Sequence, residues 1–202
     1  MLAAASLTGA ASAQEIDVSE RVEFYSVRGD SPEALLREMQ AKGPTGVLDL
    51  GRRYFAQADS SVSWSYQYEN TPLGCAVDTA EVVVETTYTY PLWEGREKAS
   101  ARLNAYWDHF LSRLEIHERG HADISRSAGV EIAKSIEATP PQADCPALEK
   151  AIKDVAGAVM KANEKRQRAY DRETNHGETQ GAWFDVGEAR RYRAPAAPKK
   201  EE

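Results

Sequence analysis

Hydrophobic and polar residues alternate along two stretches in the first half of the chain. From residue 62 to 68, valine and aromatic residues alternate with serine and glutamine, and from 80 to 90 valine, threonine and tyrosine occupy every second position. Such alternation is typical of half-buried strands. A turn-forming segment at 71–74 lies between the two stretches, so we expect them to pair antiparallel. A shorter β-type run at 22–27 precedes a predicted helix that ends before Lys42-Gly43-Pro44.

The hydrophobic spacing changes at about Glu97. Apolar residues then recur every three or four positions as far as about Glu137, which predicts one long helix with an apolar stripe. Gly120 and Gly129 are positions where this helix can bend. A proline pair ends the pattern, and a second long helix is predicted for residues 146–172.

The order of these elements predicts an α+β domain, in which a small antiparallel sheet packs on the two long helices. The 202 residues, 42% of them hydrophobic and 28% charged, suit one domain, which we place at 14–190. Residues 183–186 are a candidate short strand within it. The segment 191–202, rich in alanine, proline and lysine, is expected to be disordered.

Two features favour export to the periplasm or the medium. The alanine-rich segment 1–13 ends in Ala11-Ser12-Ala13, which fits signal-peptidase cleavage before Gln14, although the first basic residue is Arg21. Cys75 and Cys145 suit one disulfide in an oxidising compartment, the alternative being two buried thiols.

Charge and hydropathy argue against nucleic-acid binding and against a transmembrane segment. The net charge of −7 and the interleaving of basic with acidic residues argue against a nucleic-acid-binding surface. No apolar run approaches the length needed to cross a bilayer, and the mean hydropathy is −0.59. We expect neither nucleic acid as a partner nor a transmembrane segment.

The segment His117-Glu118-Arg119-Gly120-His121 carries the clearest chemistry. Two histidines four residues apart project from one face of a helix, so both imidazoles can bind one ion. Glu118 lies beside them, where a carboxylate can take a proton from a zinc-bound water. Both histidines also fall on the apolar stripe, which argues against a merely solvated helix face. The pattern predicts a Zn²⁺ site.

A catalytic zinc needs a third protein ligand. His109 lies about 12 Å from His117 along the helix axis, too far to share the ion. His176 follows the second long helix in a turn that can return to the site, and it is the predicted third ligand. Asp123 points elsewhere and suits a solvated or supporting role, whereas Glu173 is an alternative carboxylate ligand.

Two neighbouring residues have candidate supporting roles. Tyr170 continues the inner face of the second helix, where its phenol can stabilise an oxyanion or simply pack in the core. Asp171 can orient His176 or cap the end of the helix.

Several motifs in one order resemble a known family. They are the strand motif Trp64-Ser65-Tyr66, Gly74-Cys75, the His-Glu-Arg-Gly-His helix, Asp144-Cys145, Tyr170-Asp171, Thr174-Asn175-His176-Gly177 and Thr179-Gln180-Gly181-Ala182. Over about residues 22–186 the chain resembles the bacterial family catalogued as domain of unknown function 922, described as predicted secreted zinc-dependent proteases. The resemblance implies a zincin-like α+β fold, with His117, His121 and His176 as ligands and Glu118 as general base.

The predicted function is therefore that of an exported zinc metallopeptidase of the His-Glu-x-x-His type, which hydrolyses peptide bonds through a zinc-bound water activated by Glu118. A peptide or protein substrate is expected to pair with a sheet edge near residues 80–90. One alternative is a non-catalytic zinc-binding envelope protein, which a closed four-ligand site would favour. Another is a zinc amidase or peptidase that acts on cell-wall peptides.

Overall fold

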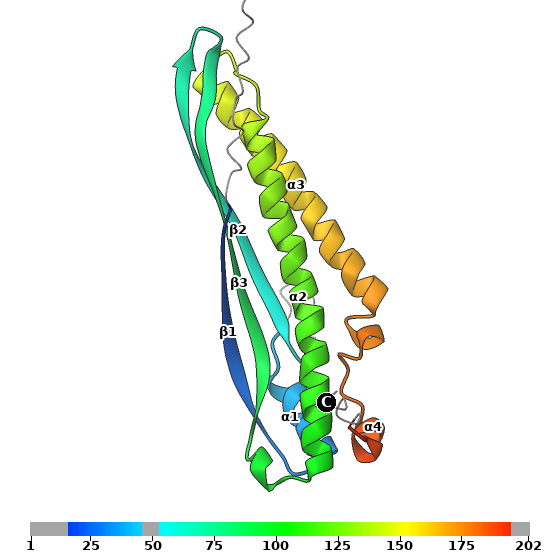
Figure 1. Ribbon diagram of the computed structural model, residues 1–202. Helices are drawn as coiled ribbons and strands as arrows, with labels where there is room; N and C mark the ends of the chain where they lie inside the picture. Colours follow the sequence, from blue (N-terminus) through cyan, green and yellow to red (C-terminus); the bar gives the residue numbers. More distant parts are fainter. Residues whose placement is uncertain (1–15, 46–52, 195–202) are drawn as a thin grey trace, which may run out of the picture.

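The computed structural model describes residues 16–45 and 53–194 as an elongated α+β molecule (Figure 1). The predicted signal segment 1–13 lies outside the described residues, as does 195–202 of the predicted tail. The first residues of that tail are structured, because Arg191 is the last residue of a helix and the ring of Tyr192 packs 5.4 Å from that of Tyr106.

The sheet has three long strands in the order β1-β3-β2. They are β1 (Asp17–Arg28), β2 (Gln57–Thr71) and β3 (Gly74–Glu94). The predicted antiparallel pair is present as β2 and β3, joined by the expected tight turn. However, β1 runs parallel to β3, so the sheet is mixed and the prediction of a purely antiparallel sheet was wrong. A parallel neighbour requires a crossover, which here runs through the first helix and β2.

The central position of β3 also corrects the expected substrate edge. Over residues 83–90 both neighbours of β3 are in place, β1 on one side and β2 on the other, so this stretch offers no free edge to a peptide. Along this stretch, and within the described residues, the outer edges of the sheet belong to β1 and β2.

Helices cover one face of this sheet. They are α1 (Pro32–Lys42), η1 (Arg96–Lys98), α2 (Ala101–Glu137), α3 (Cys145–Thr174), η2 (Glu178–Gln180) and α4 (Val186–Arg191). Figure 1 shows α2 lying along the sheet and α3 packed beside α2, whereas α1 and α4 lie near one end. The predicted strand at 183–186 was wrong: Phe184 is buried in the core and the carboxylate of Asp185 caps α4 by accepting from the Glu188 N–H.

The two long helices start where side chains satisfy their first N–H groups. The Ser100 hydroxyl accepts from the Leu103 N–H at the start of α2, and the Asp144 carboxylate accepts from the Ala147 N–H at the start of α3. Helix α2 is continuous for 37 residues, through both glycines. It begins four residues later than predicted, because residues 96–98 form the separate turn η1.

Two apolar clusters hold the helices to the sheet. The first is rich in aromatic rings and includes Tyr106, Trp107, Phe110, Leu114 and Phe184. The second lies near the other end and includes Val82, Ile132, Ile136, Leu148 and Ile152. The His117 to His121 segment of α2 lies along the helix between Leu114 and Ile132, so it is anchored on both sides by packed core.

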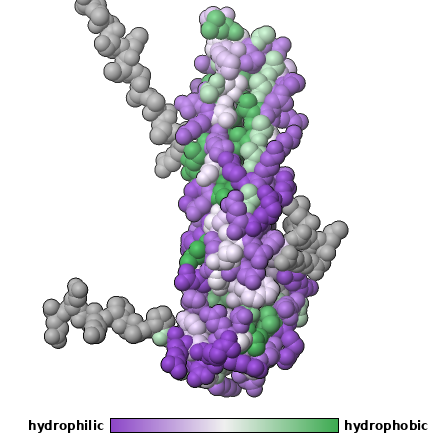
Figure 2. Space-filling model, turned by 90° about the vertical axis from the view of Figure 1, so that its right-hand side faces the viewer, coloured by the Kyte–Doolittle hydropathy of each residue, from purple (hydrophilic) through white to green (hydrophobic). Residues whose placement is uncertain are grey.

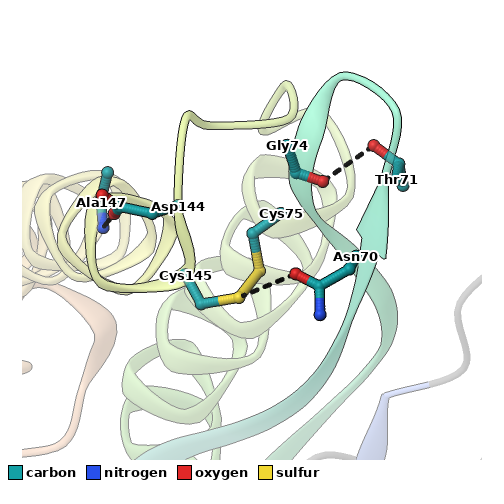
Figure 3. Close-up of a disulfide and its surroundings, with 7 residues drawn as sticks. All are labelled: Asn70, Thr71, Gly74, Cys75, Asp144, Cys145 and Ala147. Carbon is teal, nitrogen blue, oxygen red and sulfur yellow. Dashed lines mark hydrogen bonds between the residues drawn. A yellow bond between two sulfur atoms is a disulfide. The ribbon is translucent and has the colours of Figure 1, made fainter.

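A disulfide closes the end of the molecule that carries the β2–β3 turn (Figure 3). Cys75 at the start of β3 is bonded to Cys145 at the start of α3, as predicted. The backbone N–H and C=O of Cys75 also exchange hydrogen bonds with Gln142. These bonds join the far end of the sheet to α3.

Hydrophilic residues predominate on the helical side of the molecule, where hydrophobic ones form small patches (Figure 2). Among the described residues, no helix is long and apolar enough to cross a membrane.

Candidate metal centre

His117 and His121 project from α2 toward α3, as their spacing predicts. Their ring centroids are 4.8 Å apart, and the side chains are only 7% and 16% exposed. Asp171, from the last turn of α3, completes a group whose ligand atoms all lie within 4.8 Å of one another. Two imidazoles and a carboxylate are ligand types that zinc prefers.

The distances within this group suit a metal ion. Around a tetrahedral zinc with bonds of 2.0–2.1 Å, two ligand atoms lie about 3.3–3.4 Å apart. The Asp171 Oδ1 atom is 3.1 Å from His121 Nε2 and 3.6 Å from His117 Nε2. These two separations fit a shared divalent ion, and the ligand atoms of the two histidines lie within 4.8 Å of each other.

His176 approaches the same carboxylate. Its Nδ1 atom is 3.6 Å from Asp171 Oδ1, and its side chain is 32% exposed. An unusual turn brings it there: Asn175, His176 and Gly177 all have positive φ, at 49°, 52° and 84°. Left-handed backbone is costly for residues other than glycine and often marks a functional position. The structure thus places His176 beside the group, on its exposed side.

Glu118 lies next to the histidines but is directed toward the sheet. The residue is 5% exposed, and its Oε2 atom accepts a hydrogen bond from the Ala58 N–H of β2 at 2.7 Å. Ala58 belongs to the edge strand, so this bond brings the outer edge of β2 to the candidate base.

Tyr170 packs against both imidazoles. Its ring stacks on that of His117, with centroids 5.1 Å apart and an interplanar angle of 15°, and meets that of His121 edge-on at 4.9 Å. The hydroxyl donates to the backbone carbonyl of His117 at 3.2 Å. In this arrangement Tyr170 packs against both histidines, and its phenol hydrogen is engaged by the α2 backbone.

Two glutamines contact the outer nitrogens of the histidines, and neither was predicted to have this role. Gln180 Oε1 lies 2.9 Å from His117 Nδ1, and Gln167 Oε1 lies 2.6 Å from His121 Nδ1. Gln180 belongs to a motif that the sequence displays, and Gln167 is four residues before Asp171 on α3. The motif around Gln180 and the spacing of Gln167 from Asp171 are the sequence features that could have pointed to these residues. Neither feature reveals which histidine ring each amide contacts.

The other predicted candidates lie outside the group. The ring of His109 packs 5.3 Å from that of Tyr192, consistent with the packing role expected for it. Asp123 is 67% exposed and forms an ion pair with Arg126 at 3.1 Å. Glu173 is exposed.

Burial and hydrogen bonding shift the pKa values in the cluster. Burial alone would raise the pKa of Asp171, but hydrogen bonds and charge from the histidines outweigh it and hold that pKa below its usual range. Burial by itself would lower the pKa of His121. Hydrogen bonds to Asp171 and Gln167 act in the opposite direction and outweigh burial, so the pKa is raised. For Glu118, burial raises the pKa despite the nearby histidines and the Ala58 N–H.

A family model of bacterial proteins of unknown function, DUF922, matches residues 22–177. The chain belongs to this family. No curated protein and no solved structure matched the chain. The DUF922 match spans most of β1, the paired strands, α2 and α3, and it includes His117, Glu118, His121, Asp171 and His176. Gln180 lies just beyond it.

Proposed function

We propose that this DUF922 protein is an exported zinc-dependent peptidase. The observation that carries the proposal is the pairing of a His117, His121 and Asp171 donor group with a buried Glu118 directly beside it. A zinc ion held by these donors would polarise a substrate carbonyl and lower the pKa of a bound water to about 7. The disulfide is consistent with export, because such bonds persist in oxidising compartments.

Glu118 is the residue suited to move the proton. Burial raises its pKa above that of an ordinary glutamate, so the side chain takes up a proton more readily. Glu118 would accept a proton from the attacking water and donate it to the leaving amine. The Ala58 N–H holds one carboxylate oxygen, which leaves the other for this exchange.

The outer edge of β2 is the surface on which we place the substrate. The backbone N–H of Ala58 points away from β3, since it donates to Glu118 on α2. Backbone groups alternate in direction along an antiparallel strand, so those of Ser60 face the same way. An extended peptide can add to this edge as a further strand, which brings its backbone close to Glu118. Peptides N-methylated at alternate positions would then be cleaved more slowly.

Glu118→Gln tests the proposal. The amide keeps the shape of the side chain but cannot accept the proton, so zinc content should be unchanged while kcat for synthetic decapeptides falls by about 10²–10⁴-fold. Glu115→Gln is the matched control, because Glu115 is exposed and lies one turn earlier on α2. Undiminished cleavage by purified Glu118→Gln protein would exclude the mechanism.

One observation favours a second candidate, a non-catalytic zinc protein. His176 Nδ1 lies 3.6 Å from Asp171 Oδ1, so four side chains can surround one ion and close the site to substrate. Replacing zinc with Co²⁺ and adding azide or hydroxamate separates the two cases. An open site changes its visible absorption when the added ligand binds, whereas a closed one does not.

A further inference from the structure

The two candidate histidine ligands share one pattern of contacts. Each ring has its Nε2 atom turned to Asp171 Oδ1 and its Nδ1 atom turned to the side-chain oxygen of a glutamine. Gln167 comes from α3 and Gln180 from η2, so two separate elements supply the same kind of contact. Both glutamine side chains are half-buried.

The orientation of each amide is fixed by its nitrogen. Gln167 Nε2 donates to the backbone carbonyl of His121 and to the Ser125 hydroxyl, each at 3.0 Å. Gln180 Nε2 donates to the Tyr170 hydroxyl at 3.1 Å, and that hydroxyl donates onward to a carbonyl. A reversed Gln167 amide would turn its oxygen to the His121 carbonyl, which can only accept, and that hydrogen bond would be lost. A reversed Gln180 amide would need the Tyr170 hydroxyl to donate to it and so to give up the His117 carbonyl. The amide oxygens therefore face the rings as acceptors.

An acceptor at Nδ1 selects the form of the ring. A neutral imidazole carries its hydrogen on one nitrogen and a lone pair on the other. Since the glutamine oxygen can only accept, Nδ1 carries the hydrogen and the Nε2 lone pair is free to bind a metal.

We propose that Gln167 and Gln180 are positioning residues that hold His121 and His117 as Nδ1–H tautomers with Nε2 directed at the metal. The inference rests on the metal site of the proposed function and not on peptidase activity. An amide is neutral, so it orients the ring without adding the negative charge that a carboxylate partner would bring. The bound ion then keeps more of its positive charge for polarising a substrate.

The test compares Gln180→Met and Gln167→Met, which keep side-chain length but remove the acceptor, with wild type. Zinc affinity, measured by competition with a chromophoric chelator, should fall about 10–100-fold in each variant. Proton NMR of the zinc-loaded proteins adds a second readout. The Nδ1–H resonances of both rings should be protected from exchange in wild type, and each variant should lose only the resonance of its own histidine.

One further variant separates positioning from a purely structural role. Gln180→Glu retains an acceptor for His117 Nδ1, and its second oxygen can accept from the Tyr170 hydroxyl, so it should restore the zinc affinity and the Nδ1–H resonance that Gln180→Met loses. Gln142→Met is the control for the substitution itself, because Gln142 is half-buried like the other two glutamines but its side chain donates to the Pro140 carbonyl at the disulfide end. Its zinc affinity should equal that of wild type.

The outcomes distinguish this inference from the proposed function. Methionine variants that bind zinc within twofold of wild type, or a Gln180→Glu variant as weak as Gln180→Met, would overturn the positioning role alone. A wild-type protein that binds zinc with the expected resonances but cleaves no peptide would overturn the peptidase and leave the positioning role standing. A wild-type protein that binds no zinc would overturn both.

Discussion

Gly120 and Tyr170 are in direct contact across the α2–α3 interface: a Cβ atom added to Gly120 would lie 2.1 Å from the Tyr170 hydroxyl oxygen and 2.4 Å from Cζ. Because the glycine of the His-Glu-Arg-Gly-His segment has no side chain, the tyrosine ring can lie directly against the α2 backbone at this position. That ring in turn packs against both His117 and His121. The two helices fit together at the metal centre because one position on α2 has no side chain.

This contact predicts the effect of Gly120→Ala. The added methyl must displace Tyr170, so we expect a loss of about 1–3 kcal/mol in the free energy of unfolding, together with weaker zinc binding. Gly157→Ala on α3 is the matched control, because no atom lies within 4 Å of the added Cβ, and it should stabilise the protein by up to about 1 kcal/mol. Urea denaturation measures both. Equal stability of the two variants would contradict the packing argument.

Much of the frame follows from local patterns in the sequence. Alternation along 62–68 and 80–90 identified the β2–β3 pair, and the apolar stripe of α2 placed His117 and His121 on a buried face. The parallel pairing of β1 was missed, since the periodicity of one strand does not reveal its partner or direction. The run at 183–186 resembled a strand because aromatic and β-branched residues favour strands, yet Trp183 is exposed and Phe184 reaches the core from a loop.

The centre itself was only partly predictable, because its geometry depends on contacts between distant segments. His176 was expected at the site, and the turn with three positive φ angles does bring it close. Whether Asp171 or His176 supplies the third ligand depends on how α3 is rotated against α2, which spacing alone does not give. The sequence positions of Gln167 and Gln180 do not identify the histidines that they contact, since a neutral amide serves equally well on any polar surface.

The third ligand can be identified by comparing Asp171→Ala with His176→Ala. The donor atoms of His117, His121 and Asp171 form the compact group, whereas His176 lies on its exposed side, so loss of the carboxylate should cost the greater affinity. We expect zinc binding to weaken by more than about 100-fold in Asp171→Ala and by less in His176→Ala. Chelator competition measures both constants. The opposite order would support the sequence-based assignment of His176.

The disulfide predicts a stability effect that leaves the centre intact. Cys75 and Cys145 are 70 residues apart, and a cross-link of this span contributes about 3–4 kcal/mol by restricting the unfolded chain. The double variant Cys75→Ser/Cys145→Ser should lose that amount in urea denaturation under oxidising conditions. Its zinc affinity should stay unchanged at temperatures where it is folded, because the bond lies beside the apolar cluster of Ile136 and Leu148. A large loss of affinity in the folded variant would contradict this separation.

The shifted pKa of His121 predicts how the metal-free protein responds to pH. A histidine whose pKa is higher in the folded state than the unfolded value of about 6.5 stabilises the fold at pH values below 6.5, and this contribution is lost as pH rises through the folded pKa. Asp171 is ionised in both states over this range, because its pKa is lowered, so it adds no slope of its own. The melting temperature of chelator-treated protein should therefore fall between pH 6 and 8.

Asp171→Asn removes the carboxylate that raises the pKa of His121, so the fall in melting temperature over pH 6–8 should shrink. Both proteins are best compared in the Glu118→Gln background, because the raised pKa of Glu118 also destabilises the fold as pH rises. Calorimetry at several pH values gives the two slopes. If the slope is the same with aspartate and with asparagine at 171, the ion pair between Asp171 and His121 does not control the pH response of the metal-free centre.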